Sequence, residues 1–246
     1  MTDPEGLSAI SFIQKCIREK AAYMIDEMLV LHPEKVGERE ALVERKVADL
    51  TEEHKQHAKD IFTEIALAKE LFNEKIHALS SVEQDAIKYD LEKAKEVAPN
   101  ISFVELQESK DFCLQKELCI SDETLIEMEK LAYELIGKGE LEKAKAVYYY
   151  LTIVNRFVPN FWIGYAYCCN ELAIFNKAVS ACKWAIYSGE QGPLPYIYLV
   201  SSYVNIKEDV LAKAAYETAK SIIEANEKSA EYQPYLDGCK EVLENI

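Results

Sequence analysis

The chain has 246 residues, of which 49% are hydrophobic and 29% charged, a composition typical of a folded protein with one large or two small domains. Its formal net charge of −15 would repel phosphate backbones and anionic membrane surfaces, so nucleic acid is not an expected partner. The first residues carry no secretion signal, and no apolar run approaches the roughly 20 residues that span a bilayer. We therefore expect no membrane insertion and residence in the compartment where the chain is made.

Residues 1 to 110 predict a helical N-terminal extension. Its first helix carries an apolar stripe at helical spacing and ends before Pro33, because the residue before a proline disfavours the α region. That stripe comprises Ile10, Ile13, Ile17, Met24 and Met28. A second helical segment is expected from near Gly37.

A third segment is expected to begin at Thr51, a residue type that caps helices, with acidic residues in the first turn. Ser80 or Ser81 is expected to cap a fourth helix, which Pro99-Asn100 would close. The pattern between Thr51 and Val97 fits a helical hairpin or a coiled-coil arm, and it does not separate the two. The dense Glu and Lys face of this stretch indicates a solvated surface.

From near Ser121 onward the sequence repeats at a spacing of 34 residues, and this register does not extend back before residue 120. Large residues come early in each repeat and small residues late, a pattern typical of tetratricopeptide helix pairs. We predict an all-α fold in which three such repeats, beginning near Ser121, and a capping helix around Pro234 follow the extension. The positions in register are Met128, Trp162 and Tyr196; Ala144, Ala178 and Ala212; and Tyr148, Cys182 and Tyr216.

The turn inside each repeat normally carries a glycine. The first repeat has Gly139 in the run Gly137-Lys138-Gly139, whereas Ala173 and Lys207 stand in the second and third turns. The third repeat also has Asp209 where the first has Leu141 and the second has Phe175, so it departs furthest from the repeat pattern.

The first helix of each repeat should present residues to a concave face. A mixture of apolar, aromatic, amide and hydroxyl groups there suits an extended peptide. Alternatively, some of these residues pack against the N-terminal extension. The predicted groove residues are Ile126, Glu129, Tyr133 and Ile136; Ile163, Tyr167, Asn170 and Glu171; and Leu194, Ile197, Ser201, Val204 and Asn205.

The sequence offers little for catalysis, a cofactor or a metal. His54 and His57 share a helix face with acidic residues, but a zinc site needs further ligands of fixed geometry, so we interpret them as an exposed polar turn. There is no glycine-rich phosphate loop and no histidine beyond residue 77 to activate a thiol. The seven cysteines have no paired spacing and are interpreted as reduced thiols that serve as small hydrophobic residues.

About half of the chain, from Leu118 to Leu243, resembles the class II chaperones of bacterial type III secretion systems. The motifs that carry the resemblance are Leu118-Cys119-Ile120-Ser121-Asp122-Glu123-Thr124-Leu125, Leu131-Ala132-Tyr133, Gly139-Glu140-Leu141-Glu142-Lys143-Ala144 and Pro159-Asn160-Phe161-Trp162-Ile163-Gly164-Tyr165.

The resemblance implies a non-enzymatic chaperone in the bacterial cytoplasm. Its client would be an extended segment of a secreted translocator or effector, and the chaperone domain would comprise residues 111–246. The groove aromatics of the family fall on Tyr133 and Ile136, and a further aromatic position falls on Glu129. A homodimer is an implied assembly. The extension would dimerise, cover the groove or bind a second partner. The alternative function is a scaffold or regulator that assembles a complex through this N-terminal arm.

Overall fold

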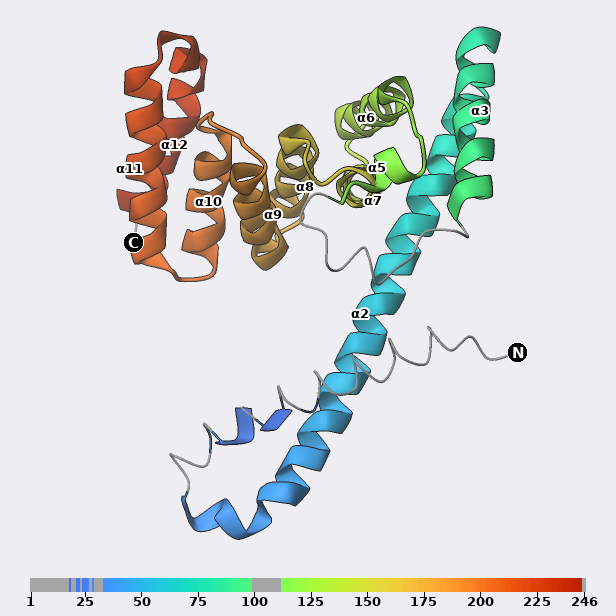
Figure 1. The fold of residues 1–246 in the computed structure, drawn as a ribbon. Coiled ribbons are helices and arrows are strands. Elements are labelled where there is room, and N and C mark those ends of the chain that lie inside the picture. The colour runs from blue at the N-terminus through green and yellow to red at the C-terminus, as the bar shows by residue number, and fades with distance from the viewer. Residues whose placement is uncertain are drawn as a thin grey trace, which may run out of the picture. The chain divides into compact units, whose positions relative to one another are not determined.

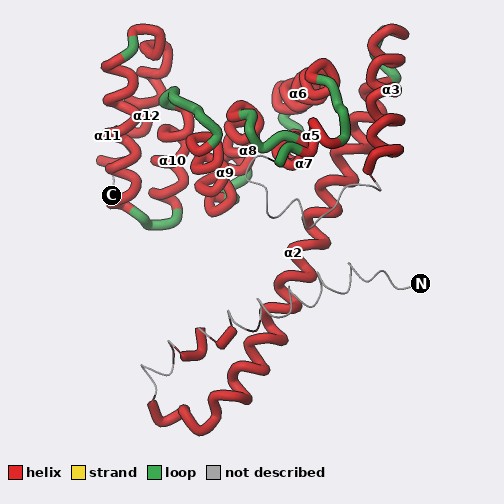
Figure 2. Tube along the Cα trace, in the orientation of Figure 1, coloured by secondary structure: helices red, strands yellow, loops and turns green. Residues whose placement is uncertain are grey.

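The computed structural model describes residues 33–98 and 112–244, together with residues 18, 21–22, 24–26 and 28. Within these ranges every regular element is helical and no strand occurs (Figures 1 and 2), which confirms the all-α class. The described residues divide into two compact units, one ending at Thr63 and one comprising residues 64–98 and 112–244. Because helix α2 (Arg39–Ile76) crosses this division, it contributes to both units.

In the first unit, a 3-10 helix, η1 (Pro33–Glu38), leads into α2. Ala21 packs with Leu50, and Ile25 packs with Val43. Met24, a member of the predicted stripe, is 38% exposed, so the buried positions differ from those expected. The other stripe residues before it, Ile10, Ile13 and Ile17, lie outside the described residues.

Helix α2 is continuous, so the helix start predicted at Thr51 is wrong. The Thr51 hydroxyl lies in the middle of the helix and donates to the Val47 carbonyl at 2.7 Å. A threonine can bond one turn back in this way without ending a helix, and the acidic residues after it simply belong to the solvated face. The predicted second and third segments are therefore one helix.

Two predicted helix caps are confirmed. Ser80 precedes α3 (Ser81–Val97) and forms a reciprocal capping box with Glu83. Ser121 precedes α6 (Asp122–Gly137), and its side chain accepts from the Thr124 N–H. The predicted closing pair Pro99-Asn100 lies outside the described residues, although α3 does end just before it.

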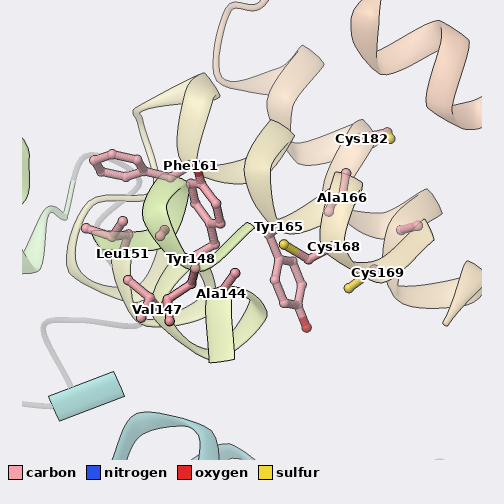
Figure 3. Packing of buried hydrophobic residues seen from close by; sticks show 14 of the residues in the cluster. Ala144, Val147, Tyr148, Leu151, Phe161, Tyr165, Ala166, Cys168, Cys169 and Cys182 are labelled. Atoms are coloured by element: carbon pink, nitrogen blue, oxygen red, sulfur yellow. The ribbon is translucent and has the colours of Figure 1, made fainter. Parts of the chain in front are cut away.

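Three antiparallel helix pairs follow the short helix α5 (Leu114–Glu117), and they coincide with the three predicted repeat segments (Figure 1). Ala144, Ala178 and Ala212 are completely buried, and their small side chains let the second helix of each pair approach the first closely. Figure 3 shows Ala144 within the buried cluster. The number of pairs that qualify as tetratricopeptide repeats stays a prediction. The pairs are α6 with α7 (Leu141–Val154), α8 (Pro159–Glu171) with α9 (Phe175–Tyr187), and α10 (Leu194–Asn205) with α11 (Asp209–Ala225).

The predicted capping helix is present as α12 (Gln233–Glu244), which follows the 3-10 helix η3 (Glu227–Tyr232). Pro234 lies in its first turn, where a missing N–H costs nothing. Leu236 and Cys239 are buried, and the Cys239 thiol lies 3.8 Å from the Ile197 carbonyl oxygen of α10. Helix α12 thus covers the last pair.

Residues 64–98 belong to the same compact unit as the helix pairs. Glu64 of α2 lies 3.5 Å from Lys145 of α7 and 3.6 Å from Lys177 of α9, and Lys75 pairs with Glu134 of α6 at 2.5 Å. The division at residue 110 stays a prediction, but these contacts tie the end of α2 to the repeats. No described helix combines the length and apolarity needed to cross a membrane.

Candidate functional site

A pocket of about 350 Å³ opens between the first helices of successive pairs. Side chains from α6, α7, α8 and α10 meet there, so three consecutive pairs contribute to one site. Four of its wall residues are tyrosines, which offer broad apolar rings with a polar edge. The pocket is lined by Tyr133, Ile136, Tyr148, Asn160, Ile163, Gly164, Tyr167, Leu194 and Tyr198.

Two of these tyrosines reach the pocket because the large and the small residue change places between the helices of successive repeats. Tyr148 comes from α7, a second helix, and passes over Gly164, where an added Cβ would lie 2.2 Å from the Tyr148 ring. In the next repeat the large residue lies on the first helix instead. Tyr198 occupies the position equivalent to Gly164, and Cys182 occupies the position equivalent to Tyr148. Both tyrosines thereby line the same pocket from different helices.

The rings hold one another in place. Tyr133 meets Tyr148 edge-on, with ring centroids 6.1 Å apart, and Tyr167 lies 6.2 Å from Tyr198 at a tilt of 49°. Such pairs favour fixed orientations over free rotation. Burial raises the pKa values of Tyr148 and Tyr198 far above the ordinary phenol value, so both hydroxyls stay protonated and can donate hydrogen bonds.

The Tyr148 hydroxyl in the pocket wall is buried without a hydrogen-bond partner, and so is Oε1 of Glu129, a predicted groove residue that lies outside the pocket lining. Glu129 precedes Tyr133 by one helical turn, so the two side chains share a face of α6. Burial raises the pKa of Glu129, because a desolvated carboxylate is costly to charge.

The structure brings five of the predicted groove residues into the pocket wall: Tyr133, Ile136, Ile163, Tyr167 and Leu194. Sequence reasoning missed Tyr198 and Asn160, and it placed Tyr148 in the repeat register without assigning it to the groove. The signal for Tyr148 is the glycine at residue 164, which marks a close approach to a helix backbone.

The remaining predicted residues lie elsewhere on the same helices. Asn170 accepts from the Ser202 hydroxyl at 2.7 Å and donates to the Tyr198 carbonyl at 3.4 Å, so it joins α8 to α10. Ile197 is 5% exposed and belongs to the core. Ile126 is 49% exposed, Asn205 donates to the Ser201 carbonyl, and Glu171, Ser201 and Val204 are outside the pocket lining.

No cluster of metal-ligating side chains occurs among the residues that the structure describes. The side chains of His54 and His57 lie outside the described residues. Six cysteines are described, none of them in a disulfide, and Cys119 is the exposed one among them. Burial raises the pKa of Cys169 to about 11, which keeps it an unreactive thiol, whereas Cys16 lies outside the described residues.

No protein-family model matches the chain, and no curated protein matches it. Solved structures do. A type III secretion system complex from Aeromonas hydrophila matches with a TM-score of 0.53 and 18% identity, over 58% of this chain and 95% of that chain.

Two further solved structures have TM-scores just below 0.5. The CopN–Scc3 complex matches with a TM-score of 0.49 and 23% identity, over 52% of this chain and 78% of that chain. The Yersinia enterocolitica type III secretion translocator chaperone SycD matches with a TM-score of 0.48 and 18% identity, over 55% of this chain and 98% of that chain. The similarity of fold therefore rests on the match to the Aeromonas complex, whose TM-score exceeds 0.5.

Proposed function

We propose that this protein is a non-enzymatic chaperone of a bacterial type III secretion system, which holds an extended segment of a translocator or effector in the cytoplasm. The observation that carries the proposal is the tyrosine-lined pocket, because it is built from the first helices of three successive pairs. The fold shared with the Aeromonas type III secretion complex supports the same class of protein. The chaperone acts alone or as a homodimer.

Occupancy of the pocket is the mechanism. A side chain of the client enters between Tyr133, Ile163 and Tyr167, where its apolar surface leaves water. Each buried CH₂ group contributes about 0.8 kcal/mol, so a few anchors suffice to hold a segment that would otherwise self-associate. Rigid aromatic walls reduce the ordering cost on the chaperone's side.

A capture experiment with the full chain tests this proposal. Immobilised protein is incubated with lysate of a type III-secreting bacterium, and captured proteins are identified by mass spectrometry. We expect secreted translocators or effectors to be retained by the wild type and lost from the double variant Tyr133→Ala, Ile163→Ala. The matched control is Tyr187→Ala, Val210→Ala, two residues that are 74% and 81% exposed outside the pocket. Equal capture by the pocket variant would contradict the proposal.

A scaffold function through the N-terminal arm is the second candidate, and the continuity of α2 favours it. This helix runs for 38 residues through both compact units. Under this candidate, partners would be lost when the chain begins at Asp60 and retained by the pocket variant. The chaperone proposal expects the reverse.

A further inference from the structure

A second pocket, of about 310 Å³, lies where α2 and α3 meet the first helix pair (Figure 1). We call it the junction pocket. All of its lining residues belong to the compact unit that contains the helix pairs, and no described residue lines both this pocket and the tyrosine-lined pocket. Its volume is at the lower end of the range for small-molecule sites, about 300–1,000 Å³. The junction pocket is therefore a separate candidate site, of a size that suits a small ligand.

The inner wall of the junction pocket is apolar. Phe72 of α2, Met128 of α6 and Val154 of α7 line it, and each is less than 5% exposed. Thr124 also lines it, but the hydroxyl of this residue already donates to Asp90 at 2.7 Å. This wall thus offers apolar surface from three helices to a ligand, which suits an alkyl chain.

The charged side chains of the junction pocket are both basic. Lys69 of α2 and Lys95 of α3 line it and are exposed, so their ammonium groups lie at its rim. The Lys69 ammonium lies 6.0 Å from the centre of the Tyr150 ring, which belongs to the same wall. Within the part of the chain that the structure describes, neither lysine forms an ion pair with a carboxylate. Two ammonium groups without counter-ions at one opening favour an anion.

This basic rim runs against the composition of the chain, in which 43 acidic residues outnumber 28 basic ones. Glu70 and Glu96 directly follow the two lysines in sequence, yet neither lines the junction pocket. Adjacent residues on a helix point about 100° apart, so the helical register turns the lysines to the pocket and the glutamates away from it. The positive charge is thereby confined to the rim, next to an apolar interior.

We propose that the junction pocket binds a single-chain amphiphile with an anionic head, the chemistry of fatty acids and alkyl phosphates. The alkyl chain lies against Phe72, Met128 and Val154, and the head accepts hydrogen bonds from the ammonium groups of Lys69 and Lys95. Apolar burial supplies most of the affinity, and the rim sets the direction in which the ligand enters. Because the walls come from both sides of the junction, the ligand also holds α2 and α3 against the first pair.

Calorimetric titration of the full-length protein with decanoate, below the concentration at which decanoate forms micelles, tests the inference. We expect saturable binding of one decanoate per chain. Each buried CH₂ group strengthens binding about fourfold, so octanoate should bind about fifteenfold more weakly. Decyltrimethylammonium, which reverses the charge of the head, should bind at least about tenfold more weakly than decanoate. A parallel titration with decyl phosphate shows whether a carboxylate or a phosphate is the preferred head.

Matched variants assign the ligand to the junction pocket. Lys69→Gln with Lys95→Gln should weaken decanoate binding about tenfold, since each exposed ion pair contributes about threefold. Lys88→Gln with Lys138→Gln makes the same change of net charge at exposed positions outside the pocket and should bind like the wild type. Ala98→Trp, at an exposed lining position, fills the opening and should weaken binding by more than about tenfold. Thermal melting of each variant reports whether it is folded.

The outcomes are independent of client capture. The variant Tyr133→Ala, Ile163→Ala should bind decanoate like the wild type, and a loss of binding there would place the amphiphile in the tyrosine-lined pocket and overturn the inference. Absence of saturable binding, or equal affinity for decanoate and decyltrimethylammonium, would overturn it too. So would binding that appears only in Phe103→Ser, a change in the segment after α3, because the chain's own residues would then be the occupant.

Discussion

Gly164 shows how one residue sets the geometry of the pocket. The residue lies in α8, where the ring of Tyr148 crosses the helix backbone so closely that no Cβ can fit. Glycine normally weakens a helix interior by about 1 kcal/mol relative to alanine. Here that cost permits a large ring from the neighbouring helix to reach the pocket, so the glycine serves packing rather than flexibility.

We predict that Gly164→Ala destabilises the protein by about 1–3 kcal/mol, because overpacking displaces a fully buried ring. The same change at Gly137, where nothing lies within 4 Å of an added Cβ, is expected to stay within about 0.5 kcal/mol of wild type. Urea unfolding followed by circular dichroism measures both. Equal stabilities of the two variants would show that the Tyr148 ring moves aside at no cost.

Asp90 of α3 caps the start of α6, a helix that begins about 30 residues later in the sequence. Its carboxylate accepts from the Ser121 N–H at 2.9 Å and from the Thr124 hydroxyl at 2.7 Å, both at the start of α6. Burial acts to raise the pKa of Asp90, but the hydrogen bonds from Ser121 and Thr124 outweigh burial, and the net pKa is lowered. The ionised form is therefore favoured by folding.

We predict that Asp90→Asn lowers the free energy of unfolding at neutral pH by about 1–3 kcal/mol, because buried donors on α6 lose a charged acceptor. A carboxyl group with a lowered folded-state pKa stabilises above its unfolded pKa of about 3.9 and loses this effect as pH falls through the folded value. The difference between variant and wild type should thus be constant from about pH 7 to 5 and shrink below about pH 4. Asp85→Asn, at an exposed site on the same helix, is the matched control.

At the scale of elements, the turn inside each helix pair uses the same backbone conformation regardless of residue type. Gly139, Ala173 and Lys207 have φ values of 76°, 57° and 64° and lie in register. The left-handed region suits glycine and costs other L-residues about 1–2 kcal/mol. Ala173 and Lys207 therefore adopt the same turn as Gly139 and are strained in it; they do not form a different turn.

We predict that Ala173→Gly and Lys207→Gly each stabilise the protein by about 0.5–1 kcal/mol, since relief of strain exceeds the added chain entropy of glycine. Gly139→Ala should destabilise by a similar amount, because it introduces the same strain. Thermal melts of the three variants provide the comparison. A loss of stability in Ala173→Gly would mean that its methyl group contributes more than its backbone strain costs.

Local signals explain which elements could be predicted. The register of 34 residues located the helix pairs, and Ser80 and Ser121 located two helix starts, because caps act within one turn. The same kind of local signal gave the wrong helix start at Thr51, because a threonine followed by acidic residues looks like a helix cap even when it lies in the middle of a helix. The pocket needed more than periodicity. Ile163 and Tyr167 follow from the register, whereas Tyr148 reaches the pocket only through the absent side chain at Gly164.

At the scale of the whole molecule, the division between compact units falls inside α2 rather than in a linker. Phe72, Ile76 and Ile87 share one buried cluster with Leu125 and Met128 of the first pair. A stack of helix pairs exposes apolar surface at each end unless a terminal element covers it. Helix α12 provides that cover after the last pair, and residues 64–98 provide it before the first.

We predict that a chain beginning at Asp60 folds and melts cooperatively, whereas a chain beginning at residue 111 is destabilised by several kcal/mol. The shorter chain loses the partners of Leu125 and Met128, and each fully buried apolar side chain contributes about 1.5–3 kcal/mol. Urea unfolding by circular dichroism measures the difference.

Phe72→Ala in the full-length protein tests the same surface without truncation, and it should lower the free energy of unfolding by about 3–5 kcal/mol. Equal stability of the two shortened chains, together with a small effect of Phe72→Ala, would show that the repeats need no cover on their N-terminal side. In that case the end of α2 would be available for a partner instead.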